Sequence, residues 1–206
     1  MNQITAAIHD TPVFLSMEAA VEPVAPYLIS ALSSIPKEKM KEGARVQIGF
    51  SDFLFHSEGD GFRILAPDYK AQPTINTTED LTIALWVLFE QAKFVSQYRL
   101  NDAPIRYFDR ITVAKDALLH PLLSLQRFSE LKEHSGWVIE SLQRQADGSI
   151  LAASDEYETI FAFELLKARP ELIKLLVLPF DYFAVIEGSE IKEIQNEKGE
   201  SLLRSR

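Results

Sequence analysis

The sequence has no cysteine among its 206 residues. Disulfide bonds, thiolate nucleophiles and cysteine-ligated zinc sites are therefore excluded. Histidine is scarce as well, and the four histidines lie far apart, so no two have the spacing that places both imidazoles on one helical face. They are His9, His56, His120 and His134. A metal site would have to be assembled from distant segments, and we predict none.

The chain also lacks the short motifs of common enzyme chemistry. It has no G-x-S-x-G nucleophile elbow, no P-loop and no G-x-G-x-x-G fingerprint. Two acidic pairs, Glu79-Asp80 and Asp155-Glu156, could support acid–base catalysis. Each pair stands where a helix is predicted to begin, however, and the helix dipole favours acidic residues there. We therefore predict no catalytic residues and no cofactor.

Basic residues are outnumbered, with 21 lysines and arginines against 30 acidic residues, a net charge of -9 and a pI near 5.0. General nucleic-acid binding needs a basic face, so this balance argues against it but permits a basic protein partner. No apolar run approaches the roughly 20 residues of a transmembrane helix. The N-terminus has no basic region followed by an apolar run. We expect a cytoplasmic protein without a signal peptide and without a membrane partner.

The most prominent feature that is present is a predicted helix over residues 77–98. Thr77 can cap it, and Glu79 and Asp80 place negative charge near its start. From residue 81 to residue 89 only Thr82 is not apolar. A helix that is apolar nearly all round is typical of a protein core.

Periodicity and turn residues predict the remaining elements. Helices are expected at 26–35, 157–168 and 170–176, and strands at 45–50, 62–66, 110–114, 137–142, 182–187 and 190–194. The pattern of residues 122–131 fits a helix or a strand equally well. Together these elements predict an α+β fold with antiparallel sheets packed on a buried central helix, and a smaller α+β half at the C-terminal end.

A break at His134-Ser135-Gly136 suggests a boundary between two halves, residues 1–133 and 134–206. The first half holds 17 acidic and 13 basic residues, and the second holds 13 acidic and 8 basic. The smaller half is the more acidic per residue, so we expect an electrostatic partner site there.

Within that half, Tyr157 stands among Asp155, Glu156 and Glu158. An aromatic ring supplies contact area and acidic groups steer a basic partner, so these four residues are a candidate protein-binding patch. An ordinary helix N-terminus is the alternative interpretation, because Ser154 could cap a helix that begins here.

Two groups of segments resemble a known family. The first comprises Ile48-Gly-Phe-Ser51, Pro67-Asp-Tyr69 and Glu79-Asp-Leu-Thr82 leading to Gln91; the second comprises His134-Ser-Gly-Trp137, Arg169-Pro-Glu-Leu172 and Leu178-Pro179. Together, over about residues 40–195, they are similar to Imm33-like immunity proteins of bacterial polymorphic-toxin and type VI secretion systems. His134 departs from the resemblance, since an acidic residue is expected there. The resemblance implies a small α+β cytoplasmic protein that binds and neutralises a cognate toxin, and it assigns no contact residues.

Three functional hypotheses remain open at this point. The first is a non-enzymatic immunity protein that occludes a toxin. The second is a ligand-binding, peptide-binding or scaffold module, which a deep apolar pocket with convergent polar groups would favour. The third is an enzyme that uses dispersed carboxylates and His134, which a buried carboxylate of raised pKa would favour.

Overall fold

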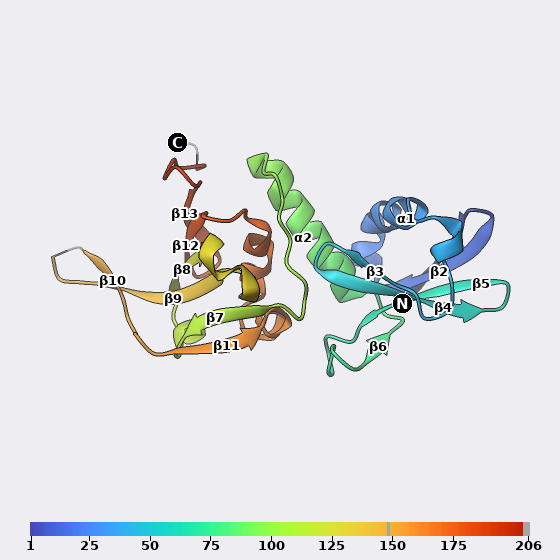
Figure 1. Ribbon diagram of the computed structural model, residues 1–206, viewed down its shortest axis with the longest axis horizontal. Coiled ribbons are helices and arrows are strands. Elements are labelled where there is room, and N and C mark those ends of the chain that lie inside the picture. Colours follow the sequence, from blue (N-terminus) through green and yellow to red (C-terminus); the bar gives the residue numbers. More distant parts are fainter. Residues whose placement is uncertain (148, 204–206) are drawn as a thin grey trace. The chain divides into compact units, whose positions relative to one another are not determined.

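The computed structural model describes residues 1–147 and 149–203, without the side chains of residues 132–134 and 150. The chain forms two compact units, Met1–Ala92 and Lys93–Arg206. Each unit is built on its own β-sheet with short helices, as the ribbon shows (Figure 1). The α+β class predicted from the sequence is confirmed. The division falls inside helix α2 (Thr82–Tyr98).

The first unit is a sheet with strand order β1-β2-β5-β4-β3, and the short strand β6 pairs with β5. The elements are β1 (Asn2–Ile8), β2 (Thr11–Met17), α1 (Ala25–Ser33), β3 (Arg45–Ile48), β4 (Ser51–Glu58), β5 (Gly61–Pro67) and β6 (Thr77–Thr78), followed by α2. All of the paired strands run antiparallel except β2 and β5, which are parallel.

The core of the first unit forms because alternate strand residues are apolar and point to one side of the sheet. Helix α1 adds Leu28 and Leu32, Leu81 packs in just before α2, and the first turn of α2 adds Leu85. The strand residues that complete this cluster include Ile8, Val13, Leu15, Met17, Phe53, Phe55 and Ile64.

Helix α2 is shorter than predicted, because Thr77 and Thr78 pair with β5 instead of opening the helix. The backbone N–H of Thr82 donates to Asp80 Oδ1 at 3.1 Å, so Asp80 does stand at the helix start. Its other carboxylate oxygen lies 3.0 Å from Lys70 Nζ. The apolar run is not buried on all sides as predicted, since Phe89 is 46% exposed and Ile83 and Trp86 are only partly buried.

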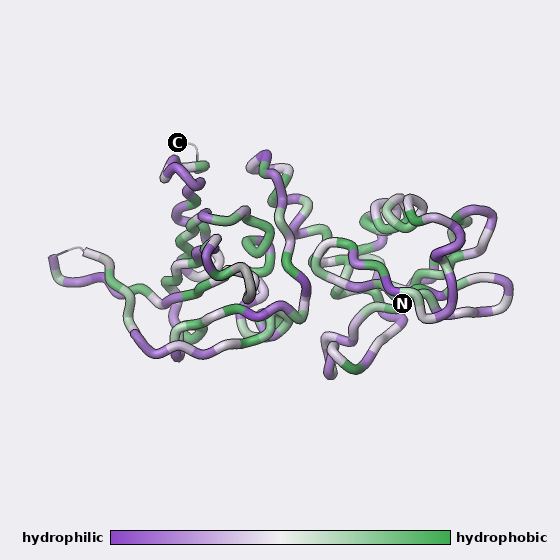
Figure 2. Tube along the Cα trace, viewed as in Figure 1, coloured by the Kyte–Doolittle hydropathy of each residue, from purple (hydrophilic) through white to green (hydrophobic). Residues whose placement is uncertain are grey.

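The second unit is a sheet with strand order β11-β7-β9-β8-β12-β13, and β10 pairs with β9. The elements are β7 (Arg110–Ala114), β8 (Leu122–Arg127), β9 (Trp137–Arg144), β10 (Ile150–Ala152), β11 (Tyr157–Phe161), α3 (Leu165–Ala168), β12 (Phe183–Glu187) and β13 (Glu190–Gln195), with 3-10 turns between them. Strands β7 and β9 are parallel, and the other pairs are antiparallel. Hydrophobic and hydrophilic residues alternate along the strands (Figure 2).

The compact units divide the chain well before the predicted boundary near residue 134. The predicted break lies at the end of the connection between β8 and β9, two neighbouring strands of one sheet. Residues 135 and 136 both have positive φ. A Cβ at Gly136 would lie 2.6 Å from the carbonyl oxygen of Phe128, so only glycine fits this turn. The turn residues at 134–136 therefore belong to a connection between two strands of the second unit.

Two predictions for the second unit have definite outcomes. The undecided segment 122–131 is strand β8 followed by a 3-10 turn. The predicted helix over 157–168 was wrong, because residues 157–161 form β11, which pairs antiparallel with β7, and only Leu165–Ala168 is α-helical. Tyrosine, threonine, isoleucine and phenylalanine all favour strands, and pairing with β7 outweighs the helical spacing of the apolar residues.

Arg127, at the end of β8, is a buried cation of the second unit that binds three backbone carbonyl groups. Only 5% of it is exposed. Its guanidinium donates to the carbonyl oxygens of Ser135 at 3.0 Å and Leu178 at 2.8 Å, and also to that of Ala103. Its Cζ lies 4.3 Å from the ring centroid of Phe180. Burial lowers the pKa of Arg127 to about 10, so the group stays charged at neutral pH.

None of the helices in the described parts of the chain combines the length and the hydropathy needed to cross a membrane.

We expect Arg127→Met to lower the free energy of unfolding by about 3 kcal/mol or more, because it leaves buried carbonyl groups without donors. Urea unfolding of purified protein measures the change. The matched control is Arg144→Met on β9, whose side chain is 60% exposed; its effect should stay below about 0.5 kcal/mol. Equal losses for the two variants would contradict the role assigned to Arg127.

A second prediction concerns the start of α2. Burial raises the pKa of Asp80, but hydrogen bonds from Thr82 and Lys70 outweigh it, and the net shift is downward from 3.8. Asp80→Ala should cost about 1 kcal/mol, whereas Asp80→Asn keeps an oxygen acceptor for the Thr82 N–H and should cost less. Because the folded pKa is depressed, the charge-dependent part is present above about pH 4 and is lost as the pH falls through the folded pKa. Thermal unfolding at neutral and acidic pH tests this; an Asp80→Asn deficit that is the same at both would refute it.

Candidate functional site

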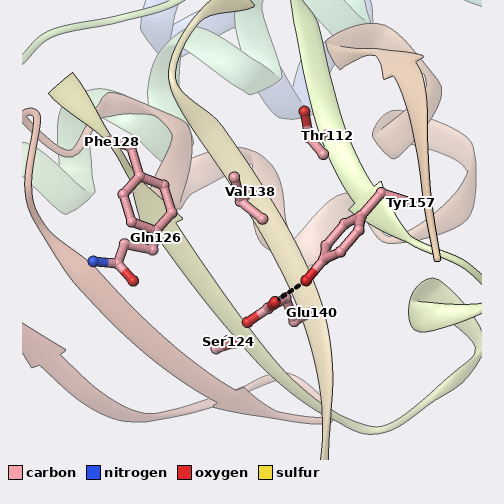
Figure 3. Close-up of a pocket in the computed structure, with 7 residues that line it drawn as sticks. All are labelled: Thr112, Ser124, Gln126, Phe128, Val138, Glu140 and Tyr157. Carbon is pink, nitrogen blue, oxygen red and sulfur yellow. Dashed lines mark hydrogen bonds between the residues drawn. The ribbon is translucent and has the colours of Figure 1, made fainter. Parts of the chain in front are cut away.

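The second sheet has one face in the core and one face that carries polar and apolar groups together. The face that lies in the core carries the buried residues Ile111, Val113, Leu123, Leu125, Ile139, Ala184 and Ile186. The alternate residues on the other face line a shallow hollow of about 280 Å³. Its lining consists of Thr112, Ser124, Gln126, Phe128, Val138, Glu140 and Tyr157 (Figure 3).

Strand register brings these residues together from distant parts of the chain. Thr112 on β7 is the parallel partner of Val138 on β9, and Gln126 on β8 is the antiparallel partner of the same valine. Ser124 stands opposite Glu140 in the same ladder. Directly opposed residues point to the same face of a sheet, so three strands contribute to one surface.

Tyr157 reaches this surface from β11. Its hydroxyl donates to Glu140 Oε1, as the dashed line shows (Figure 3). This hydrogen bond raises the pKa of Tyr157 above its usual 10.0, and burial and the nearby carboxylates of Glu140 and Asp155 act in the same direction. The phenol is therefore neutral at physiological pH, and its ring stays 47% exposed over the hollow.

The four predicted patch residues remain neighbours, but they open a strand rather than a helix. Asp155, Glu156, Tyr157 and Glu158 are all exposed. Glu156 Oε2 forms an ion pair with Lys115 Nζ at 2.7 Å. The Ser154 hydroxyl accepts the backbone N–H of Glu156 at 3.1 Å and shapes the turn into β11, so it caps no helix.

The acidic excess is local, not a property of the whole second unit. The chain divides after residue 92. The first unit carries 12 acidic and 6 basic residues, and the second unit carries 18 acidic and 15 basic residues. The unit containing the patch is thus the less acidic of the two, contrary to the expectation from the predicted halves. From residue 155 to residue 164, however, the chain has four acidic residues and no basic one.

The other chemical candidates have structural partners. Glu79 pairs with Arg63 at 3.2 Å, and the ring nitrogen of His56 lies 3.3 Å from Glu42. Trp137 is 1% exposed and belongs to the core. The side chain of His134 lies outside the described residues. Among the described side chains, no group of three histidine and acidic residues is placed to hold a metal ion.

Sequence reasoning missed Glu140 and the rest of the hollow. The alternation of Trp137 and Ile139 with Val138 and Glu140 does identify two faces of β9. It gives no indication that β7 and β8 flank this strand, or that β11 brings Tyr157 to Glu140. Only the long-range pairing assembles the site.

A family model described as the Imm33-like domain matches residues 90–197. This range includes every residue that lines the hollow, together with all of β11. No curated protein matches the chain, and no solved structure matches it.

We expect Tyr157→Phe to remain folded and to lose less than about 1 kcal/mol of stability, because the lost hydrogen bond is partly exposed to solvent. Since the folded pKa of Tyr157 is raised, its contribution is complete below about pH 10 and is lost as the pH rises beyond that value. Urea unfolding at neutral and alkaline pH should show the gap between wild type and Tyr157→Phe closing at high pH. A gap that widens with pH would contradict the assigned hydrogen bond.

Proposed function

The chain belongs to the Imm33-like family, and on that premise we propose that it is an immunity protein, which binds a cognate toxin and neutralises it. The toxin would come from a bacterial polymorphic-toxin or type VI secretion system, and neutralisation would take place in the cytoplasm. The observation that carries the proposal is the family match over residues 90–197, which covers most of the second unit.

The mechanism is inhibition by occupancy. An immunity protein of this kind needs a stable fold and a surface complementary to the toxin, and it needs no reaction of its own. The outer face of the second sheet supplies such a surface, since it combines the aromatic ring of Tyr157 with the apolar side chain of Val138 and the carboxylate of Glu140. Aromatic groups in a polar surround are the usual anchors of protein interfaces.

We place the toxin contact on Asp155, Glu156, Tyr157 and Glu158 together with this outer face. The acidic residues lie at the entrance to β11 and are exposed. Such groups accelerate the approach of a basic surface and contribute to specificity, whereas the aromatic ring contributes contact area. The toxin surface is accordingly expected to be basic where it meets β11.

The function is tested by expressing a toxic neighbouring gene product with and without this protein. We expect co-expression to restore growth and the two purified proteins to form a one-to-one complex, whose association rate falls as salt rises because charge steers the encounter. Absence of both protection and a complex would overturn the proposal.

The position of the contact is tested with charge reversals. The double variant Asp155→Lys/Glu158→Lys should slow association about tenfold or more at low salt, since it reverses the steering field. The matched control is Glu38→Lys/Asp60→Lys, which makes the same change in net charge at exposed positions of the first unit. Stopped-flow or surface-binding kinetics measure both. Equal effects of the two double variants would show that only total charge matters.

A further inference from the structure

Strand β11 is the last strand of its sheet. It pairs with β7 on one side, and in the described part of the chain no strand pairs with its other side. Two backbone hydrogen bonds at the ends of the β11–β7 ladder show which residues of β11 direct their backbone groups toward β7. Lys115 N–H donates to Glu156 O at 2.8 Å, and Ala162 N–H donates to Asp109 O at 2.9 Å.

Backbone groups of an antiparallel strand face alternately toward and away from the neighbour. Since residues 156 and 162 direct these groups toward β7, the N–H and C=O groups of Glu158 and Ile160 also face β7. Those of Tyr157 and Thr159 face away from β7, along the outer edge of the sheet. Phe161 N–H, the next outward donor, is bonded to Glu164 Oε1 at 2.8 Å, which closes the edge at that end.

The edge of β11 lacks several of the features that usually keep sheet edges from pairing with other chains, although Glu158 places one charged side chain on the strand. It contains no proline and no lysine, and its register with β7 runs without a bulge. The opposite edge of the same sheet is protected differently. Strand β13 carries Lys192, and Leu202 N–H donates to Ile194 O at 2.8 Å, so the chain covers its own strand there.

The surroundings of the β11 edge indicate the chemistry of an occupant. Between residues 155 and 164 the chain has four acidic residues and no basic one. Lys115 pairs with Glu156, and Arg110 Cζ on β7 lies 5.9 Å from the Phe161 ring centroid, while Asp155 and Glu158 are exposed. Tyr157 and Phe161 point to the same side of the strand, and both rings are exposed, by 47% and 37%. Carboxylates and aromatic faces both attract lysine and arginine side chains.

We propose that the toxin is held by β-strand addition: an extended segment of the toxin, rich in lysine or arginine, pairs with the outward edge of β11. This inference rests on the proposed function and specifies how the partner is bound. Main-chain hydrogen bonds to Tyr157 and Thr159 supply affinity, and the acidic and aromatic side chains beside them select a basic strand.

A second copy of the same chain is a poorer occupant of this edge. Pairing of two β11 strands would bring together two segments that each have four acidic and no basic residues. Like charges placed together across strands are destabilising, so pairing of two β11 strands is disfavoured and pairing of β11 with a basic segment is favoured.

Amide hydrogen exchange tests the pairing directly, with the inactivated toxin domain encoded beside the gene as the probe. In the free protein the amides of Glu158 and Ile160 should exchange slowly, and those of Tyr157 and Thr159 quickly. In the complex the exchange of Tyr157 and Thr159 should slow about tenfold or more. Unchanged exchange at both residues in a complex that does form would overturn strand addition and leave the proposed function standing.

A variant pair gives an independent readout. Thr159→Pro removes an outward N–H, and proline is tolerated on an edge strand where that group faces solvent. Thr159→Ala removes the same side chain and keeps the N–H, so it is the matched control. Thr159→Pro should weaken toxin binding about tenfold or more, equivalent to about 1.4 kcal/mol, while Thr159→Ala binds nearly as wild type. Circular dichroism confirms that both are folded; if Thr159→Pro is not, the exchange experiment decides.

The remaining outcomes are also informative. Equal binding by Thr159→Pro and Thr159→Ala would overturn the inference alone. A wild-type protein that forms no complex with the toxin domain would overturn the proposed function and this inference with it. A free protein that is already a dimer, with slow exchange at Tyr157 and Thr159, would show that the edge belongs to a second copy and would overturn the basic partner.

Discussion

A buried cation, Arg127, ties together the connections around the second sheet. Arg127 brings together the carbonyl groups of Ala103, Ser135 and Leu178, which come from three separate connections around the sheet. Buried carbonyls without donors are costly, so these loops can close over the core only while the guanidinium is in place. The turn at Ser135 then sets the start of β9, and β9 carries Val138 and Glu140. The outer face therefore takes its shape from an interaction on the other side of the sheet.

Much of the local structure follows from residue patterns. Pro26 at the start of a helix, the alternation of residues 45–48 and the closing pair of strands joined by Gly188 all lie where their patterns predict. The errors arise where a long-range contact outweighs a local preference. Tyr157–Phe161 has residues that suit either period, and the presence of β7 decides in favour of a strand. Residues 122–127 were ambiguous for the same reason.

The candidate site was predictable only in part. Exposure of Asp155 and Tyr157 followed from an acidic neighbourhood around an aromatic residue. The link from Tyr157 to Glu140, 17 residues apart in sequence, exists because β11 and β9 lie on either side of β7. No spacing rule in the sequence reports such an arrangement. Arg127 gave no signal either, since a single arginine at the end of an apolar strand is usually exposed at its tip.

Side chains alternate along β7, β8 and β9, so each strand packs the core with one set of residues and forms the outer face with the other. Ile111, Leu125 and Ile139 hold the core, while Thr112, Gln126 and Val138 between them face outward. A substitution at an outward position changes the outer face without changing the volume of the core. One scaffold of this kind can therefore accept different side chains on its outer face at small cost in stability.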